Sequence, residues 1–367
     1  MKYLLPLLLS TLFFCSHSFA QEAERTPADV VSGAVQAAEA LMEVLSEEQR
    51  AALMFEFGND EQRKNWSNLP EGRVRRGGIR WGDLSDQQKD AVMALLGATL
   101  SEEGVQQIID NMDGDEVLGR PQGGRRGNPN FGRDIYFLSI LGTPSTTEPW
   151  MWQFGGHHLG VNATFSGENL TLSPSLTGGQ PIDFTIDGRE VRQLAHEEDA
   201  AYRLIGSLTD EQLSDAVVED GPNDLLTGPG WSGGKPVPAG INAGKLDDEQ
   251  KQLLMSLIGT RIAIINEVHA AQRMEEIEAE LDEHWFAWFG STEPGGVAGF
   301  RIQGPTILME YAPQRLGGDW TQHIHAMYRD PANDYGTADV AALESGAAQQ
   351  AESESGNDRR AGGDDGR

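Results

Sequence analysis

The stretch that decides the fold is residues 151–175, which read MWQFGGHHLGVNATFSGENLTLSPS. Polar and apolar residues alternate over 151–165 and again over 169–175, with the turn residues Ser-Gly-Glu-Asn at 166–169 between them. A period of two is typical of a strand with one buried face, and the turn joins the two strands into a hairpin. Further strands are predicted at 299–303 and 306–311, around Gly304-Pro305, and at 321–329.

Helices are predicted where a short capping pattern recurs. Residues 45–49, 84–88, 208–212 and 246–250 read LSEEQ, LSDQQ, LTDEQ and LDDEQ. In each, a Ser, Thr or Asp can cap the helix, and a Gln three residues later can reach back to the cap. Apolar residues at helical spacing follow every box. The helix from Asp247 is expected to run past Arg261 to about Glu280.

These elements predict an α+β fold, with capped amphipathic helices packed on antiparallel, hairpin-rich sheet. A weak repeat runs through the chain. Residues 136–142 are followed by STTEP at 145–149, and residues 284–290 are followed by STEP at 291–294. We therefore predict a single α+β domain over 28–335, and the repeat suggests two similar helix-plus-hairpin halves that close around one shared site.

The first twenty residues have the features of a cleavable secretory signal. Lys2 precedes an apolar run from Tyr3 to Phe14, and the small residues of Ser18-Phe19-Ala20 predict cleavage before Gln21. The alternative, a retained membrane anchor, is disfavoured because a bilayer span needs about 20 apolar residues. We expect a signal peptide at 1–20, a linker at 21–27, and a mature protein that is secreted or periplasmic.

Composition excludes several classes of function. The net charge of −29 becomes −30 when Lys2 leaves with the signal, which argues against nucleic acid and anionic membranes as partners. Cys15 is the one cysteine and lies in the signal, so neither disulfides nor thiolate chemistry is expected in the mature chain. No other run could span a membrane. Residues 336–367 are expected to form a disordered acidic tail.

The histidines are the main candidates for chemistry. Seven remain after His17 leaves, and four of them form the pairs His157-His158 and His323-Ile324-His325. On a strand, His323 and His325 point to the same side and can chelate one ion, whereas His157 and His158 point to opposite sides. We expect His158 to join the pair, with His157 as a further ligand if the preceding glycines form a bulge.

A metal site built from these four histidines would hold a divalent transition ion, with zinc or copper favoured. Three histidines and an open position are typical of catalytic sites. Hydrolysis by a metal-activated water is slightly preferred. A copper or iron oxidoreductase and a non-catalytic metal- or ligand-binding module are the alternatives, and hydrogen-bonded structural histidines are the plainest interpretation.

Three other polar residues are candidates for catalysis. Glu310 is a carboxylate in an apolar strand, where it could be a metal ligand, a partner that orients an imidazole, or a general base. Its alternative is a charge on an edge strand that faces solvent. Arg329 and Asp330 close the last predicted strand. Asp330 otherwise fits a turn around Pro331.

A basic and aromatic segment offers a candidate substrate-binding surface. Trp66, Arg75 and Arg80 lie in a region rich in arginine within an acidic chain. Such cations could hold an anionic or carboxylate-bearing substrate. The alternative is local pairing with the acidic helices.

The histidine motifs and their flanks resemble one family. They are GHHL at 156–159 and HIH at 323–325, followed by RDPANDYG at 329–336, together with NW at 65–66 and RIQGP at 301–305. The family is one of uncharacterised secreted or periplasmic bacterial proteins, also found in fungi, of about this length. The resemblance covers nearly all of the chain between signal and tail. It implies one structural unit with a histidine-centred site and no particular reaction.

Overall fold

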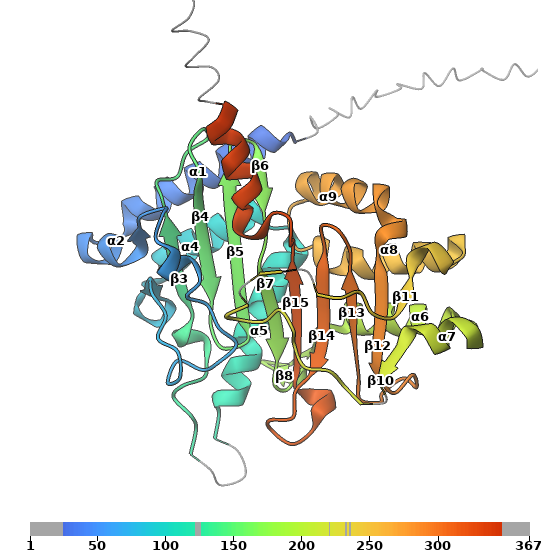
Figure 1. Cartoon of the computed structure of the whole chain (residues 1–367). Helices are drawn as coiled ribbons and strands as arrows, with labels where there is room; N and C mark the ends of the chain where they lie inside the picture. The colour runs from blue at the N-terminus through green and yellow to red at the C-terminus, as the bar shows by residue number, and fades with distance from the viewer. Residues whose placement is uncertain (1–24, 122–125, 220, 232, 235, 347–367) are drawn as a thin grey trace, which may run out of the picture.

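The computed structural model describes residues 25–346 apart from 122–125, 220, 232 and 235 (Figure 1). The predicted signal at 1–20 and the end of the predicted tail, 347–367, lie outside the described residues. The α+β class is confirmed: helices pack on one 13-stranded, mostly antiparallel sheet, beside a separate two-stranded hairpin. Among the described residues, no helix is both long and apolar enough to span a bilayer.

The described residues of the first part of the chain form five α-helices and seven strands. They are α1 (Pro27–Val44), α2 (Glu47–Leu53), β1 (Met54–Phe55), α3 (Asp60–Arg63), β2 (Ile79–Arg80), α4 (Asp86–Thr99), α5 (Glu102–Gly119), β3 (Phe137–Leu141), β4 (Trp150–Gly155), β5 (Leu159–Ser166), β6 (Asn169–Thr171) and β7 (Ser175–Gly179).

A hairpin of β8 (Asp183–Ile186) and β9 (Arg189–Arg192) leads into the second part. Its elements are α6 (Ala195–Ser207), α7 (Asp210–Ala216), β10 (Val217–Glu219), β11 (Ile241–Asn242), α8 (Asp248–Ile262), α9 (Glu267–Ala279), β12 (Trp285–Gly290), β13 (Ala298–Gln303), β14 (Leu308–Pro313) and β15 (Ile324–Arg329).

The two parts are related by pseudo-two-fold symmetry. The sheet order is β1-β3-β4-β5-β7-β15-β14-β13-β12-β10, with the antiparallel pair β7–β15 at the centre. Counted inward from either edge, the two halves therefore follow the same succession of strands. Both outer strands run parallel to their neighbours, β1 to β3 and β10 to β12. The register matches as well, since Gly155 pairs with Gly160 in the first half and Gln303 with Leu308 in the second. The predicted two similar halves are therefore confirmed.

The capping boxes explain why both halves fold alike. All four form as predicted, with the cap side chain accepting from the backbone N–H of the Gln and the Gln side chain accepting from the cap. The glutamines also bond to each other in pairs, Gln49 with Gln88 and Gln212 with Gln250. Each pair ties a short helix to the long helix behind it, so the same local pattern sets the same packing twice.

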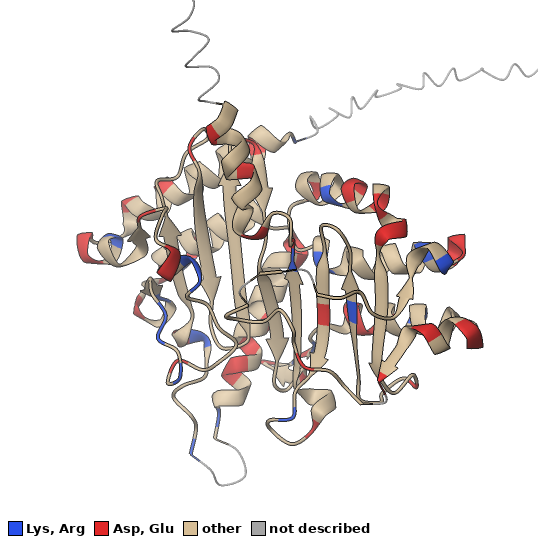
Figure 2. Ribbon diagram, viewed as in Figure 1, with Lys and Arg blue, Asp and Glu red and all other residues tan. Residues whose placement is uncertain are grey.

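The main core lies between the sheet and the long helices α1, α4, α5, α6, α8 and α9, which pack behind it in Figure 1, whereas the helix over 337–346 lies on the near face. Long segments cross the near face instead, including residues 64–78 and the described parts of 221–240, namely 221–231, 233–234 and 236–240 (Figure 1). A smaller cluster there joins Trp66 to Leu176 of β7 and Met327 of β15. Acidic residues gather on the helices, and most of the strands carry no charge (Figure 2). The negative charge of the described residues is thus spread over the outer helices.

Three expectations about element boundaries are wrong. Residues 151–165 are two strands, because the chain turns back at 156–158 and Gly155 pairs with Gly160. The predicted helix from Asp247 to Glu280 breaks after Ile262, where Asn266 caps a new helix. The predicted disordered tail begins with a helix over 337–346, where Asp339 accepts hydrogen bonds from Thr171 and Asn333.

Candidate metal site

The two pairs of histidines come from different halves and meet at one end of the sheet. His157 and His158 lie in the β4–β5 turn, which is closed by a hydrogen bond from the Gly156 N–H to the Leu159 carbonyl (2.9 Å). A Cβ at Gly156 would lie 2.8 Å from the ring of Tyr136, so glycine is needed for the turn to approach that ring. The turn directs both imidazoles inward, which an uninterrupted strand would not do.

His323 and His325 lie at the start of β15 and point to the same side, as predicted. His325 pairs with Gly178 of the neighbouring strand β7. A Cβ on Gly178 would lie 2.6 Å from the Ile324 carbonyl oxygen and 2.9 Å from Cδ2 of His325. The absence of a side chain at Gly178 therefore makes room for the imidazole of His325.

The Nε2 atoms of three imidazoles converge. Nε2 of His323 lies 3.3 Å from Nε2 of His158 and 3.3 Å from Nε2 of His325. Three ligand nitrogens, one from each residue, lie within 4.8 Å of one another. Nitrogens at about 2.0–2.1 Å from a tetrahedral ion are about 3.3–3.4 Å apart, so these two separations already suit zinc-like coordination.

Each of the three imidazoles is oriented by a partner on its outer nitrogen. Nδ1 of His158 lies 3.0 Å from Oδ1 of Asp115, and Nδ1 of His323 lies 2.5 Å from the Leu316 carbonyl oxygen. Nδ1 of His325 lies 3.1 Å from the side-chain amide of Asn68, which can present either N–H or oxygen. Partners of this kind fix the ring and tautomer of metal-binding histidines.

Burial keeps these imidazoles uncharged near neutral pH. Burial, reinforced by the neighbouring histidine His157, lowers the pKa of His158 to about 4, against the opposing effect of Asp115. Burial likewise lowers the pKa of His323, and it lowers the pKa of His325 well below its usual range. Neutral imidazole is the form that binds metal.

The hydrogen bonds then leave lone pairs facing each other. A carboxylate and a carbonyl accept only, so Nδ1 of His158 and Nδ1 of His323 must both carry hydrogen. In neutral imidazole, Nε2 is then a bare acceptor. The two Nε2 atoms, 3.3 Å apart and buried, face each other without a proton between them. A cation at this point would satisfy both.

Asp115, on α5, is the centre of a hydrogen-bonded group. Its carboxylate faces Nδ1 of His157 (3.2 Å) and of His158, and it accepts from the Tyr136 hydroxyl (2.9 Å). Burial opposes ionisation of Asp115, but the two histidines outweigh it and lower the pKa of this carboxyl below its usual range. Burial, together with this anion, raises the pKa of Tyr136. Asp115 is therefore an anion that accepts from three donors.

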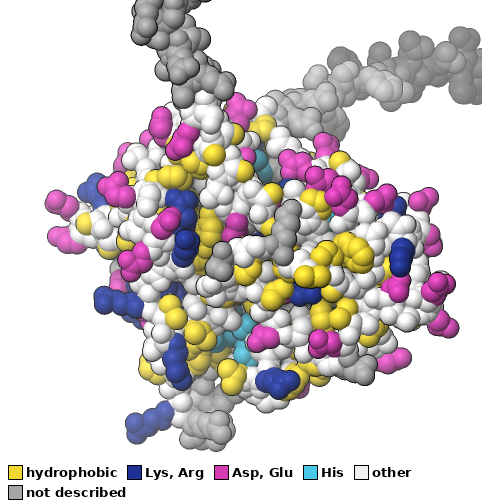
Figure 3. Space-filling view, viewed as in Figure 1, with side chains coloured by type: hydrophobic (Ala, Val, Ile, Leu, Met, Phe, Trp, Pro, Cys, Tyr) yellow, Lys and Arg dark blue, Asp and Glu magenta, His cyan; other side chains and the backbone are white. Residues whose placement is uncertain are grey.

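His157 has a different position from the other three. It forms a second group of possible ligands with Asp115 and His158, but not with the pair on β15. Its ring packs between His158 (3.7 Å between centroids) and Phe131 (4.7 Å). All four imidazoles are buried, and only small patches of histidine reach the face of the molecule shown in Figure 3.

Glu310 is fully buried on β14, and it neither faces solvent nor contacts the histidines. Its carboxylate accepts from the backbone N–H groups of Leu226 (3.0 Å) and Thr227 (2.9 Å) and from the Thr227 hydroxyl (2.6 Å). It therefore anchors the near-face segment to the sheet.

Arg329 and Asp330 are also engaged away from the histidines. Arg329 donates to the Thr227 carbonyl (2.8 Å), pairs with Asp334 (2.5 Å), and lies over the rings of Trp66 and Trp231. Asp330 accepts from the backbone of the turn at 332–333 and pairs with an arginine of α9. The structure does not bring these two residues to the metal site.

The predicted substrate-binding residues are divided between two places. Arg75 and Arg80 line one surface groove, which Glu71 and Asp83 also line. Trp66 lies elsewhere, where its indole N–H donates to the Tyr335 hydroxyl (2.8 Å). It packs against the middle of the sheet.

Sequence reasoning missed Asp115, Asn68 and Gly178, which all contact the histidines. Asp115 lies in a helix rich in acidic residues, where one carboxylate has no special spacing. Asn68 comes from a loop that Arg76 holds against the β4–β5 turn through the carbonyls of Ser67 and Gly156. Gly178 is one of many loop and strand glycines. Only the register of β7 on β15 identifies it.

Comparison with known proteins identifies the family of the chain and no function. No curated protein and no solved structure matches the chain. A family model does match, over residues 27–337, which include every residue of the metal site. The chain belongs to the family described as "Protein of unknown function (DUF3500)".

Proposed function

We propose that the protein is an exported, metal-dependent enzyme that binds one divalent transition ion through Nε2 of His158, His323 and His325. The observation that carries the proposal is that Nε2 of His158 faces Nε2 of His323 with no proton between them. The proton of each ring lies on Nδ1, which donates to an acceptor, Asp115 for His158 and the Leu316 carbonyl for His323. Zinc or copper suits three imidazoles best. Export is supported by the signal-like first twenty residues.

Three protein ligands leave a fourth position for water or substrate, which is the arrangement of catalytic zinc sites. An ion held this way supplies Lewis-acid chemistry, and hydrolysis is the simplest reaction that it supports. Two exposed apolar side chains flank the site: Leu69 follows Asn68, and Leu316 carries the carbonyl that binds His323. Exposed hydrophobic groups beside a polar centre are typical of ligand-binding surfaces.

A redox role with copper or iron is the second candidate, because the same imidazoles bind those ions. A non-catalytic metal-binding module is the third. The identity of the ion separates the first two, since zinc has no redox chemistry.

The test is elemental analysis of the mature protein, purified without a histidine tag. We expect about one ion per chain, lost in a His323→Ala, His325→Ala double variant and kept in a His196→Ala control, whose histidine is exposed and far from metal spacing. Zinc would support hydrolysis, and copper or iron would support the oxidoreductase. No ion in either native or reconstituted protein, or full metal content in the double variant, would overturn the proposal.

A further inference from the structure

The pseudo-two-fold axis relates the metal site to a second place at the opposite end of the sheet. The β4–β5 turn corresponds to the turn between β13 and β14, which closes in the same way, with the Gly304 N–H donating to the Ile307 carbonyl (2.8 Å). In this correspondence His157 and His158 become Pro305 and Thr306. The second half therefore has the same frame without the imidazoles.

In both halves a helix side chain bonds to the turn backbone and an acidic residue bonds to a turn side chain, but the residue types differ. In the first half, Asn111 of α5 donates to the His158 carbonyl, and His158 bonds to Asp115. In the second half, Arg273 of α9 donates to the Thr306 carbonyl, and the Thr306 hydroxyl donates to Glu280 (3.3 Å). A helix thus holds each turn, and an acidic residue contacts each turn side chain.

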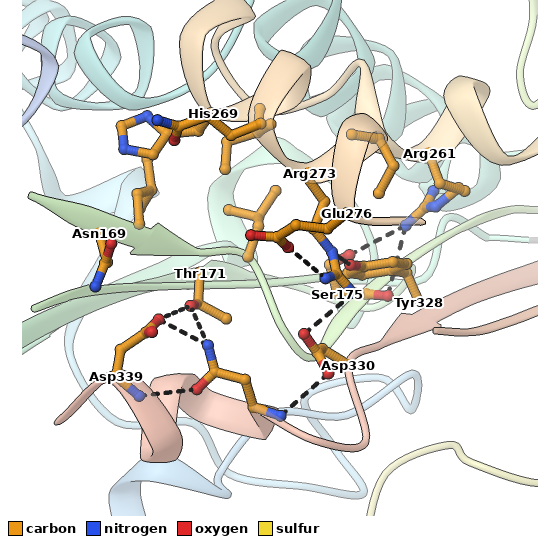
Figure 4. Close-up of a pocket in the computed structure, with 16 residues that line it drawn as sticks. Asn169, Thr171, Ser175, Arg261, His269, Arg273, Glu276, Tyr328, Asp330 and Asp339 are labelled. Atoms are coloured by element: carbon orange, nitrogen blue, oxygen red, sulfur yellow. Dashed lines mark hydrogen bonds and ion pairs between the residues drawn. The ribbon is translucent and has the colours of Figure 1, made fainter. Parts of the chain in front are cut away.

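Beside this frame lies an open pocket, shown in Figure 4, between α8, α9, β6, β7 and the end of β15. It encloses about 130 Å³. One water needs about 10–15 Å³ on this scale, so the pocket has room for a ligand of about ten non-hydrogen atoms. Two leucines of the β6 region and two isoleucines from the end of α8 supply an apolar wall, and the other walls are polar.

Both arginines of the pocket are already paired with carboxylates. Arg273 bonds to the Tyr328 hydroxyl (3.1 Å) and pairs with Glu276 (2.8 Å) and Asp330 (3.1 Å), as the dashed lines in Figure 4 show. Arg261 faces Glu197 (3.5 Å). A ligand anion needs two free donors to be clamped, and these arginines do not offer them.

Several hydrogen-bonding atoms remain open, and they are of both kinds. On the donor side, the Tyr328 hydroxyl accepts from Nε of Arg273 and keeps its own proton to donate. On the acceptor side, Oε1 of Glu276 and Oδ1 of Asp339 have no partner among the described residues, since their contacts use the other oxygen. Hydroxyl groups both donate and accept, so they match such a mixed lining.

We propose that this pocket binds a small, neutral ligand rich in hydroxyl groups, of the monosaccharide or polyol class. The polar edges would bond the hydroxyls, and the aliphatic wall would cover the C–H face. The site is separate from the proposed metal centre and does not depend on it.

The test is calorimetric titration of the mature protein with D-glucose, D-galactose, D-mannose and glycerol. Inorganic phosphate, putrescine and glycine serve as anionic, cationic and zwitterionic probes. We expect at least one neutral probe to bind with one site per chain. The affinity for this probe should fall about 3- to 10-fold in Tyr328→Phe and in Glu276→Gln, because each variant loses one hydrogen bond to it.

Glu275→Gln is the matched control, because Glu275 is the exposed neighbour of Glu276 on α9 and does not line the pocket. It should leave binding unchanged. Glu276 is itself exposed, so its variant is expected to fold. The His323→Ala, His325→Ala variant should still bind the neutral probe, which separates this proposal from the metal site. No binding of the four neutral probes, binding of only the charged probes, or equal affinity in Glu276→Gln and Glu275→Gln would overturn the proposal.

Discussion

Acidification should destabilise the metal-free protein through the buried imidazoles. In the unfolded chain a histidine takes up a proton near pH 6.5. In the folded protein burial lowers the pKa of His158 to about 4 and that of His325 well below its usual range. Between these values the unfolded state binds more protons than the folded state, so the free energy of unfolding falls as the pH falls.

The magnitude follows from the gap in pKa. When the pH falls from about 7.5 to about 5, each histidine that stays neutral only in the folded state lowers the free energy of unfolding by about 2 kcal/mol. His158 and His325 together should cost about 4 kcal/mol. This is a large part of the stability of about 5–15 kcal/mol that is usual for a folded domain. The loss is complete once the pH is below the folded pKa.

The assay is urea unfolding of chelator-treated protein at both pH values. Other buried groups also titrate, so the comparison is between variants. In His158→Gln, His325→Gln the loss of unfolding free energy on acidification should be smaller by about 4 kcal/mol than in the unmodified chain. His196→Gln, at an exposed position, should leave the loss unchanged. The same loss in the double variant and in this control would refute the reasoning, because the site imidazoles would then be charged or exposed.

Three further predictions concern the surroundings of the site. Asp115→Asn should weaken zinc binding about 10- to 100-fold in a chelator competition, because the ring of His158 loses its anionic acceptor; unchanged affinity would contradict that role. Glu310→Ala should cost about 2–4 kcal/mol of unfolding free energy and speed proteolysis near Thr227, because buried N–H groups lose their acceptor, whereas the exposed control Glu293→Ala should do neither. Gly178→Ala should cost about 1–3 kcal/mol of unfolding free energy and reduce metal content, because its Cβ meets Ile324 and His325, whereas Gly206→Ala, in helix α6 with open space at its Cβ, should lower neither.

Much of the fold could be predicted from local patterns. The capping boxes identified four helix starts, because a cap and its Gln act over three residues and need no tertiary partner. The strands β13 and β14 were predicted as a pair around Gly304-Pro305, and β15 as a further strand within 321–329. The repeat was visible because the same short motifs occur before corresponding strands in each half.

The turn at 156–158 escaped prediction because its residues continue the pattern of a strand. Gly155 and Gly156 suggested a bulge, but only the pairing of Gly155 with Gly160 shows a reversal. This error reversed the expected geometry of His157 and His158, which contact one carboxylate instead of pointing to opposite faces.

The part of the candidate site formed by His323 and His325 could be predicted from their spacing in the sequence. The His323 and His325 pair lies on one strand, so its geometry is local. Asp115 and Asn68 reach the site through tertiary packing, which no spacing encodes. Glu310 was singled out because a carboxylate in an apolar strand is unusual. That signal correctly marked a buried charge, but its partners are backbone N–H groups of a distant segment.

The central pairing of β7 with β15 also has a consequence for how the chain reaches its native state. β7 is complete well before β15 during synthesis, so the first half must wait with an uncovered strand edge. Because the two halves are alike, the β7 edge of another unfinished copy offers a competing partner for that edge. Unpaired edges of this kind are the usual starting point for domain exchange and aggregation. The same symmetry that builds a broad sheet from a short repeated unit therefore creates an interval in which self-association competes with folding.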